Sequence, residues 1–263
     1  GSDAIFDAVM KQCGVLRAES LEEAFNWCKF LASSPVPKSF QSIIVTNGGG
    51  IGVMATDACE KFGVELYDDQ ASLKTAYEAV TPSFGSTKNP IDITGGANAK
   101  DYTAALTVTA ENKDIGSTIG LYCETAVFTS EDLAKMLSET YAKHQEENKS
   151  IAYALVGGKQ VENAIESLRT QNVPVFNDVD KAVSCIGAQF KYYKYLEEFS
   201  SKIDDYDIDE KAINRIIDGA LQEGRTFLLA NEGAGVMQAA NIRMPKSRIA
   251  RNINEAVAYA EEI

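Results

Sequence analysis

Three consecutive glycines follow a run of apolar β-formers in the segment IIVTNGGGIG, residues 43–52. Glycines at such a place let the backbone come close to a ligand, because no Cβ stands in the way. If a helix starts here, its first N–H groups lack acceptors within the helix and its dipole favours an anion. The segment predicts an anion site, with a ligand-free strand-to-helix turn as the alternative; the site residues would be Asn47, Gly48, Gly49, Gly50, Ile51 and Gly52.

The motif does not match the common phosphate loops. A dinucleotide fingerprint needs an acidic residue after the second strand, and Asp68 and Asp69 come roughly ten residues too early. A P-loop ends in Gly-Lys followed by Ser or Thr, which this turn lacks. A flavin mononucleotide site is expected to have a Ser/Thr-rich loop and flanking aromatic residues, and the turn has neither. The motif alone leaves the identity of the anion open.

Two further loops are expected to face the same crevice. In KNPIDITGGA, residues 88–97, a proline forces extended backbone, side-chain oxygens favour a turn and two glycines permit a second close approach. An Asx-type turn that caps the next helix is the alternative for this loop. The other loop follows the strand expected at residues 117–123. The candidate crevice residues are Asn89, Asp92, Thr94, Gly95, Gly96, Glu124 and Thr125. Gly157 and Gly158, after the fourth strand, are expected to be mainly structural.

Five apolar segments alternate with helical patterns between residues 37 and 200. These segments are SIIVTN, VELY, STIGLYC, SIAYALVG and VPVFN, and an insertion over residues 81–106 interrupts the second unit. The alternation predicts an α/β fold, a flavodoxin-like doubly wound five-stranded parallel sheet. The carboxyl ends of the first and third strands then flank the point where the strand order reverses, which places the candidate loops together.

The segments on either side of residues 37–200 contain too few predicted elements to bury a core of their own. Residues 1–36 predict a helix, a short strand at VLRA and a second helix, and prolines at 35 and 37 mark a boundary. Residues 201–263 predict an acidic linker followed by amphipathic helices. Both flanks are expected to be partial pieces of neighbouring α/β domains, less protected from proteolysis than the region between them.

Composition narrows the class of protein. The net charge of -13 argues against a nucleic-acid partner, because backbone phosphates need a basic face. The five cysteines are isolated, which favours reduced thiols in a cytoplasm over disulfides or a metal site. No stretch reaches the roughly 20 apolar residues of a membrane span. His144, the one histidine, is expected on the solvated surface at the polar end of a helix.

In order and spacing, four segments resemble the second flavodoxin-like domain of the NDP-forming acyl-CoA synthetases. They are VTNGGGIGVMATDACEKFGVEL, KNPIDITGGANAKDYTAAL, VGGKQVENAIESLRTQNVPVF and DKAVSCI. This family includes the ADP-forming acetate:CoA ligases and is related to succinyl-CoA synthetase. The resemblance implies three parts: residues 1–36 end a preceding succinyl-CoA-synthetase-like domain, residues 37–200 form a ligase-CoA domain, and residues 201–263 form a linker helix and the start of a truncated ATP-grasp domain.

The resemblance also implies an activity. Acyl-CoA, ADP and phosphate would interconvert with acid, CoA and ATP through an acyl phosphate and a phosphohistidine that lies outside this chain. The complete enzyme would use CoA and ADP or ATP with Mg, while this chain would bind at most phosphate, hold no catalytic residue and be inactive alone. The partners would be the missing CoA-binding and ATP-grasp domains, in a homo- or hetero-oligomer, and the small acyl-CoA or acid substrate.

Two other classes of function stay open at this point. One is a ligase-like region that regulates a fused protein acetyltransferase, in which the ligase domains do not catalyse. The other is a stand-alone flavodoxin-like binding module.

Overall fold

The computed structural model describes residues 2–200, 206–245 and 247–262, without the side chains of residues 199 and 200. The chain divides into two compact units, Gly1–Ser200 and Ser201–Ile263. All of the described strands belong to the first unit.

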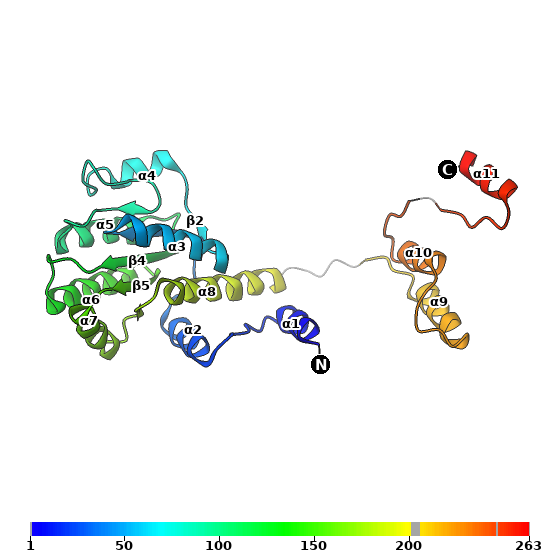
Figure 1. The fold of residues 1–263 in the computed structure, drawn as a ribbon, viewed down its shortest axis with the longest axis horizontal. Coiled ribbons are helices and arrows are strands. Elements are labelled where there is room, and N and C mark those ends of the chain that lie inside the picture. The colour runs from blue at the N-terminus through cyan, green and yellow to red at the C-terminus, as the bar shows by residue number, and fades with distance from the viewer. Residues whose placement is uncertain (1, 201–205, 246, 263) are drawn as a thin grey trace. The chain divides into compact units, whose positions relative to one another are not determined.

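The first unit is built on a parallel sheet with the strand order β2-β1-β4-β5-β6 (Figure 1). The long central strands are β1 (Gln41–Thr46), β4 (Ser117–Cys123) and β5 (Ser150–Val156). The short outer strands are β2 (Glu65–Leu66) and β6 (Val175–Phe176). The order reverses between β1 and β4, so the predicted doubly wound α/β fold is confirmed.

The described sheet has a sixth strand, which the sequence pattern missed. The expected insertion contains β3 (Ile91–Asp92) and the helix α5 (Ala99–Glu111), so it is a further β-α unit. Both β2 and β3 pair with the edge of β1 that faces away from β4, β2 at the start of β1 and β3 at its end. β3 is two residues long, too short to show an alternating pattern.

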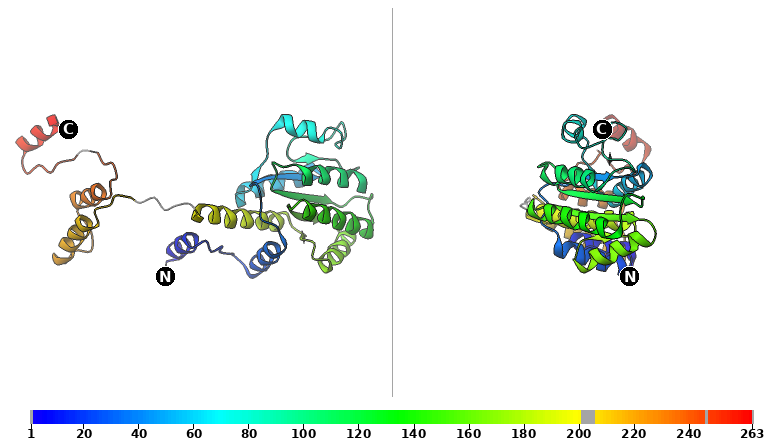
Figure 2. Two further views of the ribbon diagram at one scale, coloured as in Figure 1. Left: turned by 180° about the vertical axis from the view of Figure 1, so that it is seen from behind. Right: turned by 90° about the vertical axis from the view of Figure 1, so that its left-hand side faces the viewer.

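Helices cover both faces of the sheet, as Figure 2 shows. One face carries α4 (Gln70–Tyr77), α5, α6 (Ser130–Glu146) and α7 (Lys159–Thr170). The other carries α2 (Leu21–Ser33), α3 (Gly49–Phe62) and α8 (Val179–Ser200). Successive residues of β1 supply the two cores in turn, because side chains of a strand alternate between the two faces of its sheet.

The amino-terminal flank differs from its prediction in one element. Residues 15–18, expected as a strand, have no strand structure, and a lone four-residue segment has no neighbour here with which to form a ladder. The helix α1 (Asp3–Gln12) buries none of its residues, whereas α2 buries Phe30. Trp27 Nε1 donates to Ser184 Oγ on α8 at 3.3 Å, so α2 is attached to the core of the first unit.

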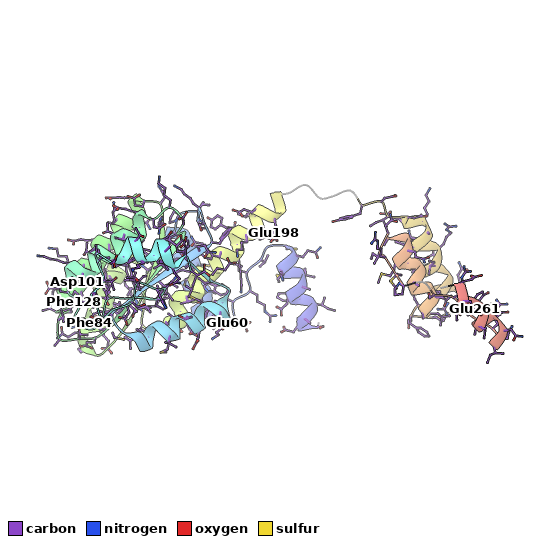
Figure 3. The ribbon with its side chains drawn as sticks, turned by 90° about the horizontal axis from the view of Figure 1, so that it is seen from above. Glu60, Phe84, Asp101, Phe128, Glu198 and Glu261 are labelled. Atoms are coloured by element: carbon purple, nitrogen blue, oxygen red, sulfur yellow. The ribbon has the colours of Figure 1, made fainter. Side chains whose placement is uncertain are left out.

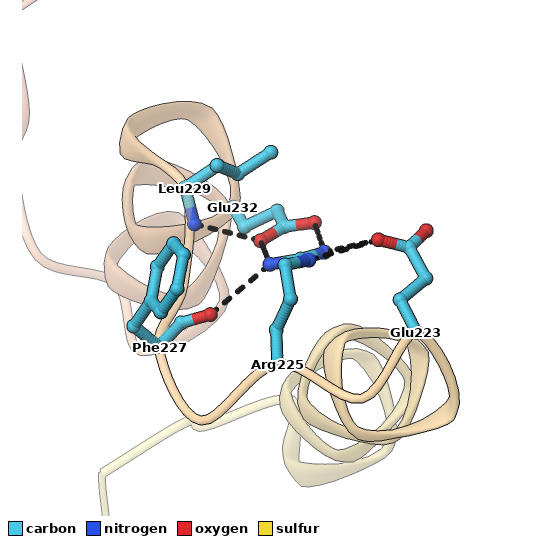
Figure 4. A network of polar contacts seen from close by, with 5 residues as sticks. All are labelled: Glu223, Arg225, Phe227, Leu229 and Glu232. Carbon is cyan, nitrogen blue, oxygen red and sulfur yellow. Dashed lines mark hydrogen bonds and ion pairs between the residues drawn. The ribbon is translucent and has the colours of Figure 1, made fainter.

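The second unit contains α9 (Glu210–Gln222), α10 (Ala230–Ala239) and α11 (Ile253–Glu262). Arg225 joins α9 to α10 through a two-pronged contact with Glu232, at 2.8 and 2.7 Å (Figure 4). The same guanidinium contacts Glu223 at 2.8 Å and donates to Phe227 O at 3.0 Å, and Glu232 also accepts from Leu229 N. These bonds fix the turn between the two helices.

His144 is buried, and its expected place on the solvated surface is wrong. Its Nδ1 lies 2.8 Å from Thr140 O and its Nε2 lies 3.0 Å from Thr118 Oγ1. A carbonyl only accepts, so Nδ1 donates and Nε2 accepts from the threonine hydroxyl. The polar residues around position 144 suggested exposure, but this position lies on the side of α6 that packs against β4.

Candidate functional site

The carboxyl ends of β1 and β4 are joined by the side chain of Asn47. Its Nδ2 donates to Cys123 O at 2.9 Å, and its Oδ1 accepts from Cys123 N at 2.8 Å. Asn47 is 4% exposed, so both bonds are largely shielded from water. This predicted site residue therefore holds together the two strand ends between which the chain order reverses.

The glycine-rich turn starts α3 directly after this contact. Gly48 is the N-cap, its N–H donates to Thr46 Oγ1 at 3.0 Å, and its carbonyl accepts the first helical bond from Gly52. The N–H groups of Gly49, Gly50 and Ile51 precede that bond and have no acceptor among the described residues. Three unpaired donors at the positive end of a helix favour a negatively charged ligand, and the anion site itself stays a prediction.

The structure offers no steric reason for the first three glycines. A Cβ on Gly50 would meet nothing within 4 Å, and one on Gly48 or Gly49 would have only ordinary contacts, of 3.5 Å or more. None of the three needs a left-handed backbone conformation. Gly52 differs, because its Cβ would lie 3.3 Å from Thr46 Cγ2 and 3.5 Å from Pro90. Of the four glycines in this turn, packing within the fold therefore requires only Gly52.

The loop after β3 lies beside this turn. A Cβ on Gly49 would be 3.5 Å from Asp92 Oδ2, and a Cβ on Gly95 would be 3.8 Å from Asn47 O. Asp92 Oδ1 accepts from Thr94 N at 2.8 Å in an Asx-type turn, but the side chain that caps the next helix is that of Asn98. Thr94 has a φ of 69°, which costs a β-branched residue on the order of 1–3 kcal/mol. The structure brings this loop and the glycine-rich turn together.

Asn89 has a different place from the other candidates. Its Oδ1 accepts from Ile44 N at 3.0 Å, and its Nδ2 donates to Ser42 O and Tyr67 O at 2.9 and 3.0 Å. These backbone groups lie where the edge of β1 passes from β2 to β3. The Asn89 amide substitutes for missing ladder bonds and is fully occupied by the sheet.

Glu124 and Thr125 follow β4 and lie next to the end of β5. The Glu124 carboxylate accepts from Gly158 N, and a Cβ on Gly157 would collide with the Glu124 side chain at 2.5 Å or less. Thr125 N donates to Tyr122 Oη at 3.2 Å, while its Oγ1 is buried and has no partner among the described residues. Gly157 is thus required by packing, and Gly96, the remaining candidate, would have open space around a Cβ.

Exposed apolar side chains surround these loops, and the sequence reading missed them. Val53 and Met54 on α3 are 62% and 60% exposed, and Phe84 in the loop before β3 is 80% exposed. Figure 3 shows Phe84, Asp101 and Phe128 together at one end of the first unit, with Glu60 near the end of α3 lying away from them. The available signal was the unbroken apolar run at 53–55, since one face of a helix cannot bury successive residues.

Neither a metal site nor a membrane helix is found in the residues that the structure describes. Their His, Cys, Asp and Glu side chains form no group of three that could hold a metal ion. None of the helices there combines the length and the apolar character that a membrane span needs.

The family model described as "Ligase-CoA domain" matches residues 42–199, which include the sheet, the glycine-rich turn and the loop after β3. The chain belongs to the Ligase-CoA domain family. The family resemblance seen in the sequence is confirmed.

The relatives of the chain are ADP-forming CoA ligases. It is 38% identical over 202 residues to the acetate–CoA ligase (ADP-forming) I subunit alpha of Pyrococcus furiosus, covering 77% of this chain and 43% of that protein. It is 29% identical over 263 residues to the 4-hydroxybutyrate–CoA ligase (ADP-forming) of Nitrosopumilus maritimus, covering 100% of this chain and 37% of that protein. The chain therefore spans less than half the length of either relative. These names give the regulatory acetyltransferase alternative no support.

A solved structure supports the same relationship. The dinucleotide forming acetyl-coenzyme A synthetase 1 of Ca. Korarchaeum cryptofilum, in complex with phosphate and ADP, superposes with a TM-score of 0.71 at 33% identity. The match covers 77% of this chain and 44% of that chain. The fold of the Ligase-CoA chain is thus that of part of this acetyl-coenzyme A synthetase.

Proposed function

We propose that this chain is the part of an ADP-forming acyl-CoA ligase that receives a phosphohistidine from another domain at the start of α3. The complete enzyme would interconvert acyl-CoA, ADP and phosphate with acid, CoA and ATP. The histidine, the CoA-binding domain and the ATP-grasp domain with its Mg-bound nucleotide would lie outside residues 1–263. His144 cannot serve as the carrier, because it is buried and both of its ring nitrogens are engaged.

The observation that carries this proposal is the run of glycines at 48–50, where a Cβ would meet nothing closer than 3.5 Å. Gly49 and Gly50 lie in α3, where a glycine costs about 1 kcal/mol relative to alanine, and packing within the fold requires neither of them. A group that approaches from outside the chain gives the reason, because a bare backbone brings the three free N–H groups within reach of its oxygens. A phosphoryl group has the charge and the acceptors for that place.

Because Asp92 lies beside the start of α3, the incoming group must also carry a hydrogen-bond donor for its carboxylate. A carboxylate beside the start of α3 repels a free anion but accepts a hydrogen bond from a protonated nitrogen. When the ring of a phosphohistidine is protonated, one nitrogen bears the phosphoryl group and the other carries an N–H, and a nearby carboxylate favours this protonated form. We assign the α3 amides to the phosphoryl oxygens and Asp92 to the N–H of the ring, as carboxylates orient histidines in other sites.

The surrounding surface fits a docking role for the missing domain. Val53 and Met54 near the start of α3 and Phe84 in the loop before β3 are exposed, and exposed apolar surface favours contact with another protein or domain. Two Pyrococcus furiosus relatives are named as alpha subunits, which supports assembly with further domains or chains.

The test is Gly49→Val in the complete protein that contains the histidine-bearing domain. The branched side chain should block the approach and lower phosphohistidine formation from radioactive ATP at least tenfold, while circular dichroism stays close to that of the wild type. Gly219→Val is the matched control, since Gly219 also lies in a helix and a Cβ there meets nothing within 4 Å. Normal labelling of the Gly49 variant would contradict the proposal.

A further inference from the structure

A cavity lies near the amino ends of β4 and β5, at the end of the sheet opposite to the glycine-rich turn. It has a volume of about 320 Å³, and its lining residues are Lys38, Ala110, Glu111, Lys113, Ile115, Gly116, Glu147, Asn148 and Lys149. That volume is about ten times the share of one water molecule in the liquid, so a small organic anion fits. The proposed ligase site at the start of α3 uses none of these residues.

Lys149 forms the inner part of this cavity. The residue is only 8% exposed, and its Nζ donates to Thr109 O at 3.3 Å. This is the one hydrogen bond of the ammonium group that is found within the described residues, and an ammonium group has three donors. Two donors therefore remain for a molecule in the cavity.

The fold fixes the position of Lys149. Asn148 has a φ of 53° and ends α6 in a Schellman-type turn, in which Lys149 N donates to His144 O at 2.8 Å. Ser150, the next residue, begins β5. A lysine between a helix cap and a central strand has little freedom to leave the cavity.

The charges around the cavity favour an anion. Two of the acids, Glu111 and Glu147, share Lys143 at 3.0 and 2.9 Å, so one positive charge offsets half of their combined negative charge. Lys38 and Lys113 are exposed and belong to the lining, in a chain whose net charge is -13. The titratable groups facing Lys149 from the surrounding segments are Lys38, Glu111, Lys113, Asp114, His144 and Glu147.

We propose that Lys149 is a site of covalent acylation by small acyl phosphates that enter this cavity between Lys38 and Lys113. The unprotonated amine attacks the carbonyl carbon, a C–N bond forms and the C–O bond to the phosphate breaks. Inorganic phosphate leaves with the electron pair, and water takes the proton lost from the nitrogen. The exposed lysines hold the phosphate end of the reagent, and the product is an uncharged amide at Lys149.

Burial increases the fraction of Lys149 that is unprotonated near neutral pH. Loss of hydration lowers the pKa of Lys149 to about 8, and the nearby charge of Lys38 lowers it further, while Glu147 and Asp114 oppose the shift. Lys143 is the internal contrast, because its two carboxylate partners raise its pKa. The pKa values of these two lysines, one in the last turn of α6 and one just beyond it, are thus shifted in opposite directions.

The expected rate follows from two opposing effects. At pH 8 about half of an amine with a pKa near 8 is unprotonated, against roughly 0.3% for an ordinary lysine, a ratio on the order of 100. The lower basicity reduces the intrinsic nucleophilicity about tenfold, if amines follow the Brønsted slope of thiols. We expect Lys149 to react about tenfold faster than an ordinary exposed lysine, and Lys143 to react more slowly than either.

The proposal depends on the proposed function only for the source of acyl phosphate in the cell. The test adds acetyl phosphate as a reagent to the 263-residue chain and follows each lysine by mass spectrometry from pH 7 to 9.5. Lys149 should be labelled first, with a rate that levels off above pH 8. Labelling of Lys149 no faster than that of Lys113 would overturn the proposal and would leave the α3 site untouched.

A matched pair of reagents tests the role of the rim. Lys113→Met should slow acetylation of Lys149 by acetyl phosphate severalfold, but leave its acetylation by the neutral N-hydroxysuccinimide ester of acetic acid unchanged. Equal slowing with both reagents, or with neither, would show that Lys113 does not guide the phosphate end and would overturn entry through this rim. Lys149→Arg provides the blank for peptide assignment.

Discussion

The chemistry of His144 is decided by its neighbours. Burial lowers its pKa to about 4, although the Thr140 carbonyl opposes the shift by favouring the charged ring, and Lys149 adds to it. The unfolded chain has the ordinary value near 6.5. The folded protein therefore binds fewer protons than the unfolded chain between these two pH values, and its stability must fall as the pH decreases through this range.

We predict that His144 accounts for a loss of up to about 3 kcal/mol of unfolding free energy between pH 6.5 and pH 4. Above pH 6.5 the ring is neutral in both states and contributes no pH dependence. Urea unfolding of wild type and His144→Gln at pH 7.5, 5.5 and 4.5 measures the difference. The two proteins should differ in pH dependence over this range; parallel curves would mean that the pKa of His144 is the same in the folded and the unfolded chain.

The helix pair α9–α10 depends on one planar contact. Arg225 and Glu232 have side chains that are 16% and 22% exposed, and the guanidinium engages both carboxylate oxygens. A lysine keeps the charge but presents a single ammonium, so it cannot reproduce the paired bonds. The contact also includes the carbonyl of Phe227, which fixes the path of the turn.

We predict that Arg225→Lys loosens the start of α10 without unfolding the first unit. Amide hydrogen exchange at the first turn of α10 should become several times faster, because the Leu229 N–H loses a well-held acceptor in Glu232. Arg215→Lys on α9 is the control, since Arg215 contacts only the Lys211 carbonyl of its own helix in the described structure. An equal effect of both variants would refute the special role of Arg225.

At the scale of the whole molecule, the amino-terminal flank contains two helices with different attachment. Burial of a phenylalanine side chain is worth about 1.5–3 kcal/mol, and Phe30 on α2 is 1% exposed. Gln189 Nε2 on α8 also donates to Pro35 O at 2.8 Å, so the segment after α2 is held as well. On α1, by contrast, Ile5 and Phe6 are 66% and 50% exposed.

We predict that hydrogen exchange separates these helices. Amides of α2 should exchange about as slowly as those of α8, while amides of α1 and α11 should exchange near the rate of unstructured peptides. Limited proteolysis should then remove α1 before it cuts at residues 35–39. Early cutting at 35–39 with loss of α2 would show that the packing of α2 on α8 is weak, and would favour a domain boundary there. The boundaries of the three sequence segments, 1–36, 37–200 and 201–263, stay predictions.

The sequence by itself determined those helices and strands whose residue pattern or cap is visible within a single segment. Apolar runs of six or seven residues marked β1, β4 and β5, since a buried parallel strand needs no polar side. A serine directly before a helical pattern is a local N-cap signal, and the Ser20 hydroxyl accepts from Glu23 N at 3.1 Å at the start of α2. The glycines at 49 and 50 predict an anion site, because the cost of a glycine in a helix is visible in the chain itself, and that site stays a prediction.

Contacts between distant segments decided the rest. The strand β3, which the pattern missed, is two residues long and pairs with the end of the β1 edge, with Asn89 bridging the interval between β2 and β3. The burial of His144 and Lys149 follows from the packing of the end of α6 against β4 and α5, which no pattern within α6 contains. Local propensity and periodicity report what one segment prefers, whereas solvation and pKa depend on what a neighbouring segment covers.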